Sequence, residues 1–91
     1  MYNISSYSFS KAKSLNVDIK PSTKKNKKID VYKNNKYICS IGDSRYSDYP
    51  TYLSTHNLEY ANKRKALYHL RHQKEKDKLN TAGYYAYHIL W

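Results

Sequence analysis

Residues 28–41 contain the pattern that most constrains the fold of this chain. The segments 28–33 and 36–41 carry apolar residues on both faces of an extended strand, and Asn34-Asn35 separates them. Asparagine tolerates the positive φ that a two-residue hairpin turn requires. The pattern therefore predicts a β-hairpin over residues 28–42, with Gly42 ending its second strand.

The hairpin has two partly apolar faces. A two-residue turn places Tyr32 opposite Tyr37 and Val31 opposite Ile38. One face then shows Ile29, Val31 and Ile38, and the other shows Tyr32, Tyr37, Cys39 and Ile41. We expect one face to meet a helix and the tyrosine face to be left for a partner.

Helices are predicted on both sides of the hairpin. The strongest pattern is a long helix over residues 57–78, because Asn57 is a good N-cap and Glu59 suits the positive end of the helix dipole. Phe9, Ala12 and Leu15 indicate a short N-terminal helix over 8–15. The segment 81–91 is expected to form a C-terminal helix capped by Thr81.

Two further segments complete the expected organisation. Val17 and Ile19 alternate with charged residues, which predicts a strand over 17–20 that Pro21 ends. Residues 43–56 are interpreted as a loop, because the residue before Pro50 is biased away from helix. The predicted class is α+β in one domain over 1–91: a small antiparallel sheet, made of a strand plus the hairpin, packed by the long helix and the C-terminal helix. Whether residues 1–7 are ordered is left open.

Positive charge is the main functional signal. The chain has 17 lysines and arginines against 7 acidic residues, for a net charge of +10. A surface of one sign attracts polyanions such as nucleic acid or anionic lipid. An alternative origin of the positive charge is the base composition of the genome. A chain with many lysines and asparagines, and with 12 tyrosines against 2 glycines, is also typical of an A/T-rich genome.

The long helix provides the first candidate binding site. Arg64, Arg71 and Lys78 recur every seven residues and fall within about 40° of one another around a helix. Such a row can follow a phosphate backbone, and the flanking Tyr60 and Tyr68 can stack on bases. The alternative is a solvated basic face with helix-internal ion pairs such as Arg71 with Glu75.

A lysine run provides the second candidate. It could contact phosphates in a sequence-blind, salt-sensitive way. A flexible polar loop or a localisation signal is the alternative. The run comprises Lys24, Lys25, Lys27 and Lys28, with Lys20 before it.

Other chemistries are poorly represented. The single cysteine, Cys39, excludes an internal disulfide and suits a reducing compartment. No apolar run approaches the ~18 residues of a membrane span, and no signal-peptide core is present, so we expect an intracellular or particle-enclosed protein. His69 and His72 lack partners with metal-site spacing, and Asp43 with Asp48 is the only thin candidate for a divalent ion. We expect no metal, no cofactor and no enzymatic activity.

Several short motifs occur together in this chain. They are the hairpin, Asp48-Tyr49-Pro50-Thr51-Tyr52, Ala61-Asn62-Lys63-Arg64-Lys65 with Tyr68 and Arg71-His72, and Gly83-Tyr84-Tyr85-Ala86 with Leu90-Trp91. In this combination the chain resembles small uncharacterised basic proteins of giant nucleocytoplasmic large DNA viruses, and the likeness covers residues 7–91. Two departures are Asn34-Asn35, where a glycine is expected, and Arg64-Lys65, where paired arginines are usual.

The resemblance implies a viral source but no established activity. We expect sequence-nonspecific nucleic-acid binding, with DNA favoured over RNA, in a virion, the host cytoplasm or a viral factory. The alternative is a virion structural or interaction protein, such as a minor capsid-type component, because tyrosine is favoured at protein interfaces. Its contacts would be Tyr46, Tyr49, Tyr52, Tyr84 and Tyr87. The sequence does not indicate an oligomeric state.

Overall fold

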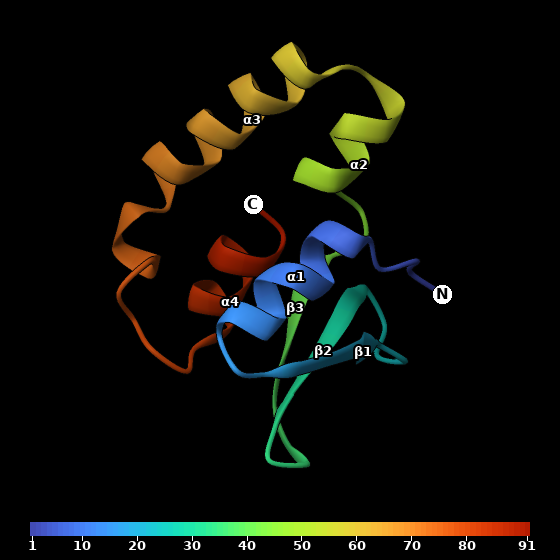
Figure 1. Cartoon of the computed structure of the whole chain (residues 1–91), viewed down its shortest axis with the longest axis vertical. Helices are drawn as coiled ribbons and strands as arrows, with labels where there is room; N and C mark the ends of the chain where they lie inside the picture. Colours follow the sequence, from blue (N-terminus) through green and yellow to red (C-terminus); the bar gives the residue numbers. More distant parts are fainter.

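A three-stranded sheet and four α-helices make up the fold. The computed structural model describes residues 1–91 and confirms the α+β class. No helix combines the length and the apolar character that crossing a bilayer requires. In chain order the elements are α1 (Ser6–Ser14), β1 (Asp18–Pro21), β2 (Lys27–Lys33), β3 (Lys36–Asp43), α2 (Tyr49–Thr55), α3 (Leu58–Arg71), the 3-10 turn η1 (Gln73–Glu75) and α4 (Ala82–Ile89) (Figure 1).

The sheet is antiparallel in the order β1-β2-β3. The predicted hairpin is confirmed: Asn34 and Asn35 have φ angles of 52° and 64°, as a two-residue turn requires. Gly42, with a φ of 79°, lies inside β3 near its end. A side chain there would meet Leu90 and Lys28.

A β-bulge corrects the predicted register of the hairpin. Tyr32 lies opposite Tyr37 as expected, but Val31 pairs with Cys39 and leaves Ile38 as the extra residue. The extra residue shifts the alternation of the strand, so that Ile41 pairs with Ile29 on the core face. Both of these isoleucines are buried. The bulge thereby gathers the apolar residues on one side of the sheet.

Helices α1 and α4 cover the apolar face of the sheet. Helix α1 packs on β1 and α4, and α4 packs on β3 (Figure 1). The Ser8 hydroxyl donates a hydrogen bond of 3.0 Å to the Ile89 carbonyl, which joins the two helices. Residues 1–7 also contact the body of the protein, since the Tyr7 hydroxyl donates to the Trp91 carbonyl at 3.2 Å.

Helix α3 occupies a different place from the one expected. Its main partner is α2 rather than the sheet, and Ala61 is its only buried residue. Helix α4 is the more apolar of the two and buries Tyr85 and Ile89, so the hydrophobic effect favours α4 at the sheet. In Figure 1, α3 stands away from the sheet on the far side of α4.

The end of α3 also differs from the prediction. The cap is confirmed, because Asn57 Oδ1 accepts from the Tyr60 amide at 2.7 Å. The helix ends at Arg71 instead of Lys78, and η1 follows. Residues 73–78 contain no apolar side chain that could be buried, and a helix without tertiary packing is marginal.

The predicted loop over 43–56 contains helix α2, so that prediction is wrong for residues 49–55. Asp48 Oδ1 accepts from the Thr51 amide at 3.0 Å and caps the helix. Pro50 occupies the first turn, where its missing N–H is not needed. The Asp-Tyr-Pro step is therefore a helix start rather than a helix block.

Candidate nucleic-acid interface

A groove of about 530 Å³ separates α3 from the body of the protein. Its walls come from the start of β2, the end of β3 with the following loop, α2, α3, and α4 with the last residues of the chain. We call it the α3 groove. The side chains that define its chemistry are Lys27, Tyr46, Tyr52, Arg64, Arg71 and Trp91, with Tyr68 and His72 between them.

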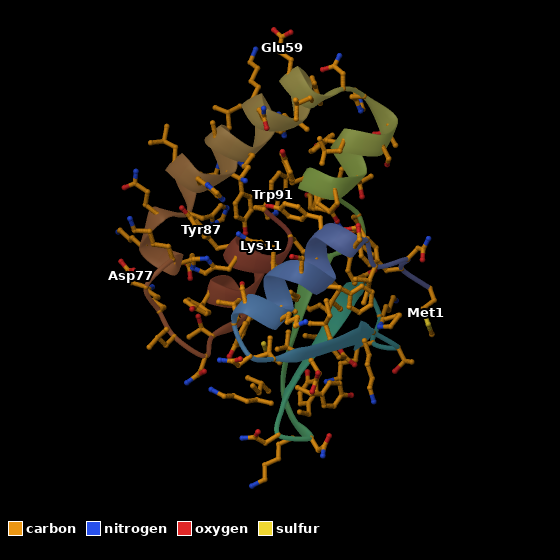
Figure 2. The ribbon with its side chains drawn as sticks, in the orientation of Figure 1. Met1, Lys11, Glu59, Asp77, Tyr87 and Trp91 are labelled. Carbon is orange, nitrogen blue, oxygen red and sulfur yellow. The ribbon has the colours of Figure 1, made fainter.

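A column of stacked rings lines the groove. The Tyr68 ring lies nearly parallel to Trp91, with centroids 4.4 Å apart and planes 6° apart. It also stacks on His72 at 4.2 Å. Tyr52 approaches Trp91 at 6.1 Å with a tilt of 52°. In Figure 2, Trp91 points into the space between α3 and the helices on the sheet.

Three cations in the groove wall have no acidic partner. Arg64 lies 5.7 Å from the centre of the Tyr52 ring, and Arg71 and Lys27 are exposed. The ion pairs of the protein are Lys28–Asp48 and Arg45–Asp43, so none of the three forms an ion pair. Lys27 lies opposite Asp43 in the sheet, and its charge helps to lower the pKa of Asp43. The expected alternative for Arg71, a pair with Glu75, does not form.

The one carboxylate in the groove wall is held by an arginine outside it. Asp43 accepts from Arg45 Nη2 at 2.8 Å and from Arg45 Nε at 3.0 Å. These hydrogen bonds lower the pKa of Asp43 to about 2. The pair leaves the positive charge of Arg64, Arg71 and Lys27 dominant in the groove.

Lys28 does not serve as predicted. Its ammonium group is buried and lies 2.8 Å from Asp48 Oδ2, so it cannot present a free charge to a phosphate. The side chain of Lys28 reaches the groove wall, but its charge belongs to a structural pair. The sequence suggested Asp43 and Asp48 as ligands for a divalent ion. In the structure each carboxylate is engaged in an ion pair, Asp48 with Lys28 and Asp43 with Arg45.

The remaining predicted site residues lie outside the groove. Lys24 hydrogen-bonds the Tyr37 hydroxyl and lies over that ring at 3.7 Å. Lys25 is exposed in the turn between β1 and β2, and Lys78 follows η1, where the spacing of seven no longer applies. Tyr60 stacks on His56 at 4.4 Å, near the start of α3.

The structure thus brings together Arg64, Arg71, Tyr68 and Lys27 from the predicted set. Sequence reasoning missed Trp91 and His72 as members of the same site. The signal for His72 was its position four residues after Tyr68, which places the two rings on one side of a helix. Nothing local could have placed Trp91 there, because its partners precede it by 19 or more residues.

The tyrosines that the protein-contact alternative requires to be exposed are only partly so. Tyr46 is exposed over 71% of its surface, but Tyr49 is buried and its hydroxyl donates to Asn62 at 2.9 Å. Tyr52, Tyr84 and Tyr87 are half-buried. Exposed hydrophobic side chains on α3 are Leu58, Tyr60, Leu67 and Leu70, with Leu70 at 68% and Leu67 at 41%.

Neither a metal site nor a known relative identifies the groove. No group of three or more His, Cys, Asp or Glu side chains is arranged to hold a metal ion. Comparison with known proteins finds no matching family model, curated protein or solved structure. The function must therefore be inferred from the chemistry of the groove.

Proposed function

We propose that this protein binds nucleic acid without sequence specificity through the α3 groove. The observation that supports the proposal is the meeting of three cations outside ion pairs with five aromatic rings, counting the imidazole of His72, in one groove of about 530 Å³. Cations attract phosphates, and aromatic faces accept any base. Arg64 and Arg71 would contact phosphates together with Lys27, while Tyr68 contributes to the stacking surface.

Two physical reasons favour sequence-blind binding. The charged groups of the groove, Lys27, Arg64 and Arg71, suit phosphate oxygens, which are the same in every sequence. The aromatic faces of Tyr68 and Trp91 distinguish poorly among bases, because stacking needs only a π-face. Affinity should therefore depend strongly on salt and weakly on sequence.

The test is a titration of labelled DNA and RNA by fluorescence anisotropy over a range of salt. Log affinity should fall linearly with log salt, and Arg64→Gln with Arg71→Gln should reduce the slope by about 1.4 if both contact a single strand. An unchanged slope would show that these arginines do not contact phosphates.

A matched control removes the same charge elsewhere. Lys33 and Lys36 are exposed and face each other beside the hairpin turn, on the opposite side of the molecule from α3 (Figure 1). Lys33→Gln with Lys36→Gln should leave the salt slope unchanged. If both double variants lower the slope equally, the binding is diffuse and the groove is not its site.

The protein-contact function is the second candidate. It is supported by the exposed Leu67 and Leu70 on α3, since exposed apolar side chains in a cluster often mark protein interfaces. If no polyanion binds at physiological salt, this surface becomes the one to test. The viral origin suggested by the resemblance stays a prediction.

A further inference from the structure

The rings and the cations line the same groove. Arg64 lies against the Tyr52 ring at 5.7 Å, and Arg71 directly precedes His72, the end of the ring column. A ligand that uses both kinds of group must present base faces and phosphates to the protein within a short length.

A duplex cannot meet this requirement. Its base faces are stacked on one another inside the double helix, so only phosphates, sugars and base edges are available on the surface. An unpaired strand has free base faces beside its phosphates, and proteins that bind single strands combine a cationic groove with aromatic stacking. The groove volume of about 530 Å³ also lies within the usual range of pockets for small ligands, about 300–1,000 Å³.

We propose that the α3 groove takes a single strand of nucleic acid, with an unpaired base stacked against the rings of Tyr46 and Trp91 and the adjoining phosphates bound by Arg64 and Arg71. This inference rests on the proposed function and narrows its ligand. Tyr46 is the exposed partner in this arrangement, with 71% of its surface accessible at the edge of the groove. Trp91 is half-buried and anchored by its stack on Tyr68.

The protein contains its own reporter for this contact. Trp91 is the single tryptophan of the chain, so selectively excited indole emission comes from the groove alone. A base stacked on an indole quenches its emission. The experiment titrates the unmodified protein with a short oligothymidylate, with an abasic strand of the same length and charge, and with a duplex, and records both Trp91 emission and binding by anisotropy.

The expected result is saturable quenching by oligothymidylate, little quenching by the abasic strand, and an affinity for the duplex at least tenfold weaker. Binding and quenching of equal strength by the abasic strand would overturn base stacking. Equal affinity for the duplex would overturn the preference for single strands. In both of these cases nucleic-acid binding itself would stand, whereas no binding to any of the three would refute the proposed function as well. An oligouridylate arm distinguishes RNA from DNA as the source of the strand.

Variants at Tyr46 test whether its ring contributes to base stacking. The ring makes no hydrogen bond and is mostly exposed, so Tyr46→Ala should leave the fold intact. We expect it to weaken oligothymidylate binding at least fivefold and to leave binding of the abasic strand unchanged. Tyr46→Phe keeps the ring and should restore the affinity.

The matched control is Phe9→Ala, which removes an exposed aromatic ring from α1, outside the groove. It should change neither affinity nor quenching. Loss of affinity in Phe9→Ala but not in Tyr46→Ala would place the strand elsewhere and overturn the inference.

Discussion

Lys28 Nζ lies 2.8 Å from Asp48 Oδ2, and both side chains are almost fully buried, with 6% and 1% of their surface exposed. Asp48 also accepts a hydrogen bond of 2.7 Å from the Tyr2 hydroxyl and caps α2 through Thr51. One carboxylate therefore ties the N-terminal segment, strand β2 and helix α2 together. The pair also fixes the position of α2, which forms one wall of the α3 groove.

Asp48→Asn should destabilise the protein by about 3–5 kcal/mol, because it leaves the Lys28 ammonium buried without a counter-charge. Urea denaturation measures the loss. The control is Asp43→Asn, which breaks the exposed pair with Arg45 and should barely move the midpoint. Similar losses in both variants would contradict the special role of the buried pair.

The same pair predicts a loss of stability in acid. Burial raises the pKa of Asp48, but hydrogen bonds from Lys28, Thr51 and Tyr2 and the charge of Lys28 outweigh burial, so the net pKa lies below its usual value. The stabilisation is then fully present above the unfolded-state pKa of about 4 and is lost as pH falls through the lower folded-state pKa. Urea midpoints measured against pH should show this decline in the wild type and a shallower one in Asp48→Asn.

His69 predicts a second pH dependence, nearer neutrality. Burial lowers its pKa below 6.5, and the charges of Lys65, Lys11 and His88 lower it further. Nε2 is buried without a hydrogen-bond partner, and the ring stacks on Tyr87 at 4.2 Å.

The unfolded chain therefore takes up this proton first, and stability falls as pH drops below about 6.5 until the folded-state pKa is reached. His69→Phe keeps a ring against Tyr87 and should remove this slope from the urea midpoints. His56→Gln, at an exposed histidine, should leave it in place. A slope unaffected by His69→Phe would assign the effect to another group.

The hairpin turn can be improved. Asn35 has a φ of 64°, which glycine adopts without steric cost. Asn35→Gly should stabilise the protein by about 0.5 kcal/mol, and Asn35→Ala should destabilise it by about 1 kcal/mol. Thermal denaturation of the two variants should shift in opposite directions; a gain for alanine would contradict the turn geometry.

The lysines of the run should differ in how much they contribute to single-strand binding. Lys27 lines the α3 groove, whereas Lys24 is engaged by Tyr37 on the sheet. Lys27→Gln should lower the salt slope of single-strand binding by about 0.7, and Lys24→Gln and Lys25→Gln should leave it unchanged. Equal effects at all three positions would indicate a loose electrostatic contact along the whole run.

The features that were predictable from the sequence depend on neighbouring residues. Asn34-Asn35 sets the hairpin turn, and Asn57 and Thr81 cap their helices through amides three residues away. Asp48 and Pro50 carried an equally local signal for α2, because an N-cap and a first-turn proline start a helix. The bias of the residue before Pro50 away from helix conceals this signal, because the same proline also suits the first turn of a helix.

Long-range packing decided the rest. The bulge at Ile38 shifts the strand by one residue, and this shift turns Ile41 toward the core. The sequence of the strand does not reveal the shift, because it depends on the burial of Ile41 under the helices that cover the sheet. The groove likewise joins segments far apart in the chain, from Lys27 to Trp91. The sequence by itself determined turns, caps and the excess of positive charge, since hydrogen bonds between near neighbours and composition are local. Only the tertiary structure decided which charges are buried, as for Lys28, and which face the groove, because burial depends on every element at once.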